Sequence, residues 1–224
     1  MKITTAHGFQ VLEGDSHLSK WVAETGRLDH DPNIELVARH IRPGSVAVDG
    51  GASLGDHTIA YLQRTDIVLA FEPNPWAYAC LQNNCPAAHS FNCALSSKVE
   101  ELFWIAEEPN YGSSYISRGR KSPRDIQVAA VTLDSYCYKF NVGYIKLDVE
   151  GWEPEALRGA RETIMRCRPV MRIEICQGTL QRAGSSEAEL LDLIGGFNYR
   201  ITEVVPGTRG LAMWDALCFP EEVK

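Results

Sequence analysis

The sequence has no long apolar run and no excess of positive charge, and each absence argues against a class of protein. No stretch approaches the roughly 18 apolar residues that a membrane-spanning helix needs. Residues 1–7 hold no apolar signal-peptide core, so we expect a cytoplasmic protein without a membrane partner. The formal charge of −7 argues against nucleic acid as a partner, although residues 118–124 form a local basic cluster.

The cysteine and histidine patterns also lack the spacing of a disulfide framework or a zinc site. Seven cysteines, an odd number, fit reduced thiols better than disulfides. Cys80 and Cys85 lie too far apart for a C-x2-C zinc knuckle, and the six histidines form no H-x-x-x-H pair. We therefore predict no bound metal, while the acids near residue 150 leave a divalent ion open.

What the sequence does contain is an alternation of apolar and amphipathic segments. Strand-like runs are expected at 45–49, 67–72, 90–94, 144–148 and 170–176, and helix-like runs at 56–64, 76–83, 154–166 and 186–195. Residues 199–205 and 212–219, separated by Pro206-Gly207, read as an antiparallel hairpin. The pattern predicts an α/β fold, with a doubly wound, mostly parallel seven-stranded sheet that ends in this hairpin.

The chain divides into a short lead-in and a main domain. Residues 1–43 are expected to form a lead-in or cap segment, with a strand at 9–12 and helices at 16–25 and 32–41. Pro43-Gly44 ends the last helix, and residues 44–224 form the cofactor-binding domain. The polar, turn-rich stretch 99–132 is expected to be irregular, as binding loops and lids often are.

A glycine-rich turn follows the first strand of the main domain. Residues 49–55 read Asp-Gly-Gly-Ala-Ser-Leu-Gly, between an apolar run and a helix-like run. Such a turn brings backbone N–H groups close to a ligand. Glu72 ends the next apolar run, 21 positions after Gly51, where an acid can bind ribose hydroxyls. The two features predict a pocket for an adenosine-containing cofactor.

S-Adenosylmethionine is the cofactor that best fits this turn. The G-x-G-x-x-G pattern of nicotinamide-binding turns is absent, since Gly51 and Gly55 are separated by three residues. Asp49 lies at the strand end, where a carboxylate can reach an ammonium group directly or through water. A ligand with an ammonium group, a ribose and no phosphate suits an acidic pocket.

The order of motifs resembles that of the FkbM-type methyltransferases, which are S-adenosylmethionine-dependent enzymes with the Rossmann-like class I fold. The matching segments are 48–58, 70–74, 94–96, 112–114, 131–134, 145–153, 157–160, 168–169 and Glu174, with weaker likeness over 15–26. The most specific signal is Lys-x-Asp-x-Glu-Gly-x-Glu at 146–153, after Phe-Glu-Pro-Asn at 71–74. About four-fifths of the chain is covered.

The residues and the resemblance together predict a site. The expected cofactor-binding residues are Asp49, Gly51, Ala52, Gly55, Glu72, Pro73, Asn74, Ala94 and Asp148, with residues 93–95 placed beside the adenine by position. The expected catalytic residues are Asp148, Glu150, His57 and Lys146. Tyr111, Ser113 and Ser114 are expected to face the methyl acceptor.

Several of these residues have structural alternatives. Asp148, Glu150 and Glu153 can cap the helix that begins near Pro154, and Glu153 fits that role best. His57 is equally consistent with a surface position. Glu174 lies inside an apolar strand and needs a partner, for which Lys146 is one candidate.

The predicted reaction is methyl transfer to oxygen. The Asp/Asn-Pro-Pro-aromatic turn of amino-group methyltransferases and the Pro-Cys of cytosine C5 enzymes are missing, and residues 148–151 read Asp-Val-Glu-Gly. The family implies a hydroxyl on a sugar or a small natural product. A ribose 2′-O-methyltransferase acting on RNA is an alternative, although the lysine expected in its tetrad is replaced by Glu174. A nicotinamide-dependent oxidoreductase and a binding protein without turnover are the others.

Overall fold

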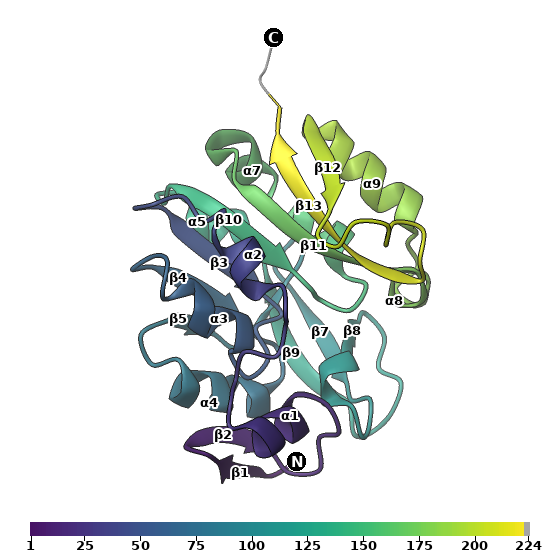
Figure 1. Ribbon diagram of the computed structural model, residues 1–224. Helices are drawn as coiled ribbons and strands as arrows, with labels where there is room; N and C mark the ends of the chain where they lie inside the picture. The colour runs from purple at the N-terminus through teal and green to yellow at the C-terminus, as the bar shows by residue number, and fades with distance from the viewer. Residues whose placement is uncertain (222–224) are drawn as a thin grey trace.

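The fold is organised around a seven-stranded sheet in the computed structural model, which describes residues 1–221 (Figure 1). The strand order is β12-β13-β11-β10-β3-β4-β5, in which β13 pairs antiparallel with its two neighbours and the other pairs are parallel. The strands are β3 (Val46–Gly50), β4 (Val68–Phe71), β5 (His89–Phe91), β10 (Val142–Leu147), β11 (Val170–Cys176), β12 (Tyr199–Glu203) and β13 (Met213–Pro220). The predicted mixed sheet and its C-terminal hairpin are confirmed.

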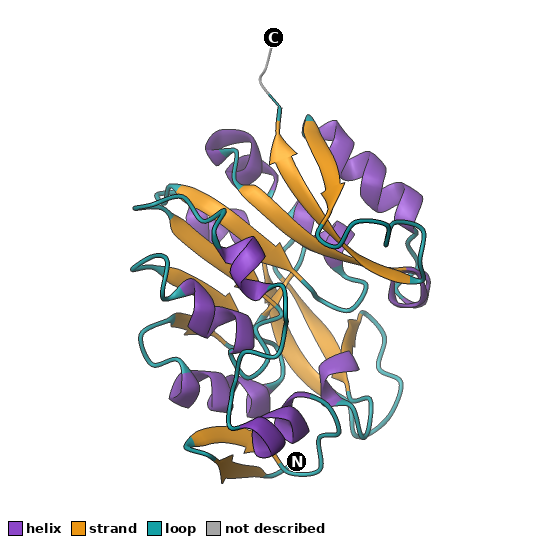
Figure 2. Ribbon diagram, viewed as in Figure 1, coloured by secondary structure: helices purple, strands orange, loops and turns teal. Residues whose placement is uncertain are grey.

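Helices cover both faces of this sheet (Figure 2). Strand alternation directs Val48 and Ile145 toward one face and Ala47 and Tyr144 toward the other, where they join different apolar clusters. The first face packs against α5 (Leu133–Cys137), α6 (Glu153–Arg158), α7 (Arg161–Cys167) and α9 (Glu187–Gly196), and the second against α2 (Ile34–Ala38), α3 (Asp56–Tyr61) and α4 (Pro75–Asn84). Among residues 1–221, no helix has the length and apolar character needed to cross a membrane.

Residues 99–132 are not the irregular insert that the sequence suggested, and this prediction was wrong. They hold β7 (Glu100–Ile105), β8 (Tyr115–Ser117) and β9 (Ile126–Val131), which form a second sheet with β6 (Ala94–Leu95) in the order β6-β9-β7-β8. Leu102 and Trp104 alternate into a buried cluster with Val128 and Ala130. The polar turns between the strands, one of them the 3-10 helix η1 (Tyr111–Ser113), obscured this alternation.

The single helix predicted at 154–166 is two helices, because the chain turns at Gly159. A Cβ atom on Gly159 would lie 1.9 Å from the carbonyl oxygen of Ser96, so the backbones meet directly. Helix α7 then restarts with its first N–H groups bound by the Asp134 carboxylate, which accepts from Glu162 at 3.0 Å and Thr163 at 2.8 Å. The helix expected at 32–41 is likewise shorter, spanning only α2, and α8 (Gln177–Arg182) was not expected.

The lead-in segment packs onto the main domain. It forms the hairpin β1 (Ile3–Ala6) and β2 (Phe9–Leu12), followed by α1 (Leu18–Thr25). Val11 and Val22 share an apolar cluster with Leu54 and Leu81 of the main domain. Asn84 at the end of α4 also exchanges two hydrogen bonds with the backbone of Gln10, at 2.8 and 3.0 Å. This packing brings the β2–α1 connection to the carboxyl edge of the large sheet.

The seven cysteines are free thiols. Burial raises the pKa of Cys80 and Cys85 to about 12, so these groups stay protonated near neutral pH. They pack in the apolar cluster beneath the lead-in segment.

The closest backbone approach in the large sheet gives a stability prediction. Gly51 has φ +76°, and a Cβ atom there would lie 1.9 Å from the carbonyl oxygen of Asp148. Gly44 has a similar φ of +70° but nothing within 4 Å. We expect Gly44→Ala to cost about 1–2 kcal/mol from backbone conformation, and Gly51→Ala to cost about 1–3 kcal/mol more from overpacking. Urea unfolding measures both, and equal losses would contradict the close approach.

Candidate functional site

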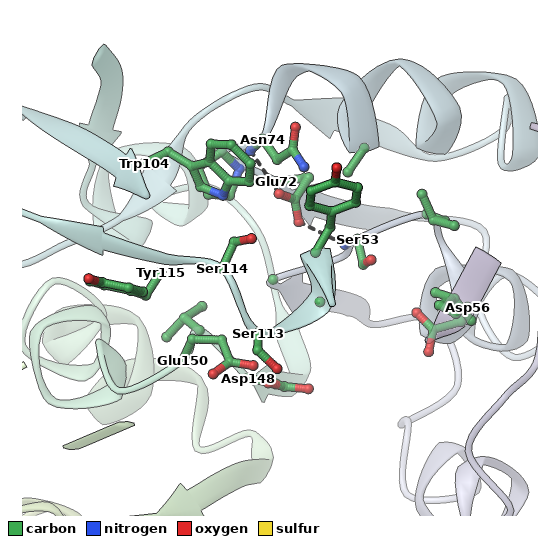
Figure 3. A pocket seen from close by; sticks show the side chains of 18 of the residues that line it. Ser53, Asp56, Glu72, Asn74, Trp104, Ser113, Ser114, Tyr115, Asp148 and Glu150 are labelled. Atoms are coloured by element: carbon green, nitrogen blue, oxygen red, sulfur yellow. Dashed lines mark hydrogen bonds between the residues drawn. The ribbon is translucent and has the colours of Figure 1, made fainter. Parts of the chain in front are cut away.

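A cavity of about 320 Å³ lies at the carboxyl edge of the large sheet, and Figure 3 shows side chains that line it. The tips of β3, β4 and β10 form part of its wall. The lead-in segment and the second sheet, with the loops of that sheet, contribute further residues. The residues most relevant to chemistry are Asp15, Gly51, Ser53, Glu72, Pro73, Asn74, Cys93, Ala94, Trp104, Tyr111, Ser113, Ser114, Lys146, Asp148, Glu150 and Glu174. This is the place where doubly wound folds bind ligands.

The glycine-rich turn closes one side of the cavity. The N–H groups of Gly51 and Ala52 both donate to the carbonyl oxygen of Phe71, at 3.0 and 3.1 Å, and so fix the turn to the tip of β4. Gly51 and Ser53 line the cavity, whereas Ala52 and Gly55 face the interior. Of the turn residues in the sequence prediction, only Gly51 therefore lies in the cavity wall.

Glu72 is held with its carboxylate fixed at the cavity wall. Its Oε2 accepts from the N–H of Ser53 and its Oε1 from the N–H of Asn74, both at 2.8 Å, as the dashed lines of Figure 3 show. Burial raises the pKa of Glu72 to about 7 despite these two donors. The turn after β3 and the tip of β4 thus share one carboxylate, as the spacing in the sequence suggested.

Asp49 does not lie in the cavity wall, where the sequence had placed it. It is fully buried; its Oδ2 accepts from Thr58 Oγ1 at 2.6 Å, and its Oδ1 lies 3.4 Å from Lys146 Nζ. Being the fourth residue of the fully buried strand β3, it points into the interior beneath the turn. A direct contact with a ligand ammonium does not fit this position.

Lys146 is the buried cation of the site. Its Nζ donates to the carbonyl oxygen of Gly51 at 2.8 Å and lies 3.6 Å from Asp148 Oδ2, in addition to its contact with Asp49. Burial alone would lower the pKa of Lys146, but the carboxylates of Asp148 and Asp49 raise it above the ordinary value. Lys146 is therefore a protonated cation whose carboxylate partners are Asp49 and Asp148. It does not form the ion pair with Glu174 that the sequence suggested.

Asp148, Glu150 and Glu174 form an acidic cluster on the other side of the cavity. One carboxylate oxygen from each lies within 4.8 Å of the others, a spacing that would allow them to bind one cation. Burial and the charge of Asp148 raise the pKa of Glu150 to about 8, and the charge of Asp148, with burial, raises that of Glu174 to about 10. Figure 3 shows Asp148 and Glu150 apart from Glu72.

Glu153, the fourth acid of the motif, has a structural position. Its Oε1 accepts from the N–H groups of Val149 and Gly151, at 2.9 and 3.3 Å, and its side chain is buried at the start of α6. It therefore fixes the loop that carries Asp148 and Glu150; its role is structural, but it does not cap α6, which has no side-chain cap hydrogen bond.

His57 lines the cavity and is buried in an ion network. Its Nδ1 lies 3.2 Å from Asp56, and its Nε2 lies 3.3 Å from Asp31 and 2.9 Å from Arg172 Nη1. Although burial alone would lower it, the two carboxylates raise the pKa of His57 to about 9. Arg172 also contacts Asp31 and binds Asp215 at 2.8 Å. Both ring nitrogens are occupied, and the surface position considered from the sequence is not found.

The lead-in segment and the second sheet meet above the cavity. Asp15 Oδ1 accepts from the N–H of Tyr111 at 3.2 Å, and the N–H of Ser16 donates to the carbonyl oxygen of Pro109 at 2.9 Å. Sequence reasoning assigned no role to Asp15 or Trp104, both of which line the cavity. The alternation of apolar residues around Trp104 could have identified that residue as part of a strand. No local feature of the sequence pointed to Asp15.

The fold matches that of class I S-adenosylmethionine-dependent methyltransferases. A TehB-like S-adenosylmethionine-dependent methyltransferase of Corynebacterium glutamicum is similar in structure, with a TM-score of 0.52, 12% identity and coverage of 91% of this chain and 94% of that one. A Streptococcus mutans protein described as a methyltransferase, solved in complex with SAH, has a TM-score of 0.53 at 9% identity, covering 83% and 94%.

The chain belongs to the FkbM family of methyltransferases, and S-adenosylmethionine is accordingly its cofactor. The sequence model of the methyltransferase FkbM domain matches residues 49–201. A methyltransferase FkbM of Methylobacillus flagellatus is similar in structure, with a TM-score of 0.54 and 18% identity over 83% of this chain. The present chain spans 50% of the length of that protein. No curated protein matches the sequence.

The ion network gives a second stability prediction. Arg172→Met should leave the buried carboxylate of Asp31 without its guanidinium partner, which we expect to cost about 3–5 kcal/mol in the free energy of unfolding. Arg200→Met, at an exposed position of the edge strand β12, should cost less than about 1 kcal/mol. Urea unfolding compares the two, and equal losses would show that the network contributes little.

Proposed function

We propose that this protein transfers the methyl group of S-adenosylmethionine to an oxygen atom, on a hydroxyl group of a sugar or another small natural product. The observation that carries the proposal is the position of Glu150, a carboxyl that lines the cavity within 4.8 Å of Asp148 in the loop after β10, where burial and the charge of Asp148 raise its pKa to about 8. A hydroxyl must lose a proton as it is methylated, and a base titrating near the working pH performs this best.

The cofactor is proposed to lie between the glycine-rich turn and the tip of β4. Glu72 would accept hydrogen bonds from the ribose hydroxyls, with Pro73 and Asn74 beside it. Cys93 and Ala94, which line the same side of the cavity, would contact the adenine. This arrangement leaves the methionine end directed toward Asp148, across the cavity.

Asp49 and Lys146 are proposed to act through the residues that they hold. Asp49 fixes Lys146, and Lys146 in turn holds the carbonyl of Gly51 and the carboxylate of Asp148. The ammonium of the cofactor would then meet the exposed face of Asp148, whose side chain is 37% exposed. Both buried groups position the site without touching the reacting atoms.

Glu150, with Asp148 as its neighbour, is the proposed general base, and His57 is not. Both ring nitrogens of His57 already face charged partners, so the imidazole has no free side on which to take a proton. Alignment of donor and acceptor can supply about 7–11 kcal/mol of the barrier, and a base adds about 10² to 10⁴ in rate. The acceptor would also contact the segment between β7 and β8, through Tyr111, Ser113 and Ser114.

Glu72→Gln tests the cofactor site. The amide nitrogen of glutamine would face one of the two N–H donors, of Ser53 or Asn74, that now bind the carboxylate. We expect the affinity for S-adenosylhomocysteine to fall about tenfold or more, because hydrogen bonds to a charged group are lost. Isothermal titration calorimetry measures this, with Glu107→Gln at an exposed position of the loop after β7 as the control. Unchanged affinity would place the cofactor elsewhere.

Glu150→Gln tests the base. Because the pKa of Glu150 is raised to about 8, its proton-accepting form increases as pH rises through that value. The single-turnover rate of methyl transfer should therefore rise with pH through about 8 in the unmodified protein. The variant should be slower by about 10² to 10⁴ and lose this dependence, while binding S-adenosylhomocysteine normally.

The measurement uses S-adenosylmethionine with a labelled methyl group and a panel of monosaccharides, amino sugars, sugar phosphates and phenols. Glu162→Gln, an exposed acid on α7, is the control and should follow the unmodified protein. Label transferred to an amine but to no hydroxyl would overturn the proposal of oxygen methylation. An identical pH profile in Glu150→Gln would assign the base to another group.

A further inference from the structure

A second cleft of about 370 Å³ adjoins the cavity on the far side of β8. Tyr115 and Ile116 line both spaces, so β8 forms their common wall. The remaining lining residues of the second cleft are Ser117, Arg118, Gly119, Lys121, Trp152, Arg182 and Ala183. The basic cluster noted in the sequence therefore does not lie on an isolated loop but opens beside the candidate site.

The two spaces have opposite charge. Every charged side chain that lines the second cleft is basic, namely Arg118, Lys121 and Arg182. The first cavity is lined instead by the acidic cluster of Asp148, Glu150 and Glu174. A molecule that extends from the first cavity into the second cleft would have one end near the proposed general base Glu150 and the other end near these cations.

Aromatic rings hold two of the three cations in place. The guanidinium of Arg182 lies 3.8 Å from the ring centre of Tyr115, and that of Arg118 lies 4.9 Å from that of Trp152. Stacking on a ring face orients a guanidinium and leaves its edge free to bind a planar or tetrahedral anion. Trp152 is itself buried, so its ring is a rigid support.

Several donors of these cations are not used within the chain. Arg118 binds Glu100 and Glu155 through Nε and Nη2, and Arg182 donates through Nη2 to the carbonyl oxygen of Glu150 at 3.4 Å. Within residues 1–221, Lys121 forms no ion pair, and Nη1 of both arginines has no hydrogen-bond partner. An anion in the cleft would satisfy them.

Arg182 connects the cleft to the proposed base. Its guanidinium contacts both the carbonyl oxygen and, at 3.6 Å, the carboxylate of Glu150. An anionic group bound at Arg182 would therefore lie next to the residue that receives the proton. This connection relates the second cleft to the acceptor rather than to the cofactor, because Glu72 lies on the other side of the cavity (Figure 3).

We propose that the second cleft binds an anionic group of the methyl acceptor, a phosphate ester or a carboxylate carried by a molecule of sugar size. The proposal rests on the oxygen-methylation function proposed above, and it narrows the acceptor to an anionic hydroxyl compound. Lys121, which has no ion pair within residues 1–221, and the free Nη1 groups of Arg118 and Arg182 suit one such group. A nucleic-acid strand would need a longer basic track than a protein of net charge −7 offers here.

The experiment measures binding to the intact 224-residue chain in the presence of S-adenosylhomocysteine. The probes are inorganic phosphate, glucose 6-phosphate, glucuronate and glucose, titrated by calorimetry at low and high salt. Lys121→Gln and Arg182→Gln remove single charges from the cleft. Arg124→Gln removes an exposed charge of the same basic cluster outside it and is the matched control.

We expect phosphate and glucose 6-phosphate to bind with an affinity that falls with salt, and glucose to bind much more weakly. Each cleft variant should weaken these anions about tenfold, whereas Arg124→Gln should not. The preference between glucose 6-phosphate and glucuronate identifies the anion as phosphate or carboxylate. In the methyl-transfer panel, Lys121→Gln should raise KM for anionic acceptors and leave kcat unchanged, whereas Arg182→Gln, which removes a cation from beside Glu150, should also move the pH profile to higher pH.

Three results would overturn the inference. The first is that anion affinities do not change in the cleft variants, and the second is that glucose and glucose 6-phosphate bind equally well. The third is that single-stranded RNA binds far more tightly than the sugar phosphates and that both variants abolish this RNA binding. The proposed function is judged separately, by S-adenosylhomocysteine binding and by the pH profile of methyl transfer in Lys121→Gln, because Lys121 forms no ion pair with Glu150 whereas Arg182 lies 3.6 Å from its carboxylate.

Discussion

The rest of the site depends on the contacts that the buried ammonium group of Lys146 makes. It joins the tip of β3 to the tip of β10, because it binds the carbonyl of Gly51 and lies between Asp49 and Asp148. A buried cation is tolerable only when its charge and its donors are matched, and here two carboxylates and a carbonyl match it. The same contacts fix the glycine-rich turn and the acidic cluster relative to each other.

A single lysine cannot neutralise the acids gathered beyond it, and this imbalance gives the site its chemistry. Glu150 and Glu174 lie near Asp148 without a comparable cation, so their pKa values rise and one carboxyl titrates close to neutral pH. The nearest further cation, Arg182, lies 3.6 Å from Glu150 and is held on the Tyr115 ring at the edge of a basic cleft. The acidic cluster that contains the proposed base Glu150 thus lies on one side of β8, and the basic side chains of the second cleft lie on the other.

The cavity is closed by segments that are distant in the sequence. The lead-in segment reaches it through Asp15, which binds the backbone of Tyr111 in the second sheet, and through Asp31, which meets Arg172 of β11. These contacts are made by groups with little exposure, so they resist competition from water. Residues 1–43 are consequently part of the wall of the site and not only an approach to it.

The sequence by itself determined the sheet, the glycine turn and the place of Glu72, because strand alternation and turn geometry are set by neighbours along the chain. It did not determine which way Asp49 points, which partners His57 and Lys146 take, or that residues 99–132 pair as strands. Those outcomes depend on which distant segments pack together, since an ion pair or a strand ladder is formed between groups whose separation only the tertiary structure fixes. The opposite charges on the two sides of β8 were decided in the same way.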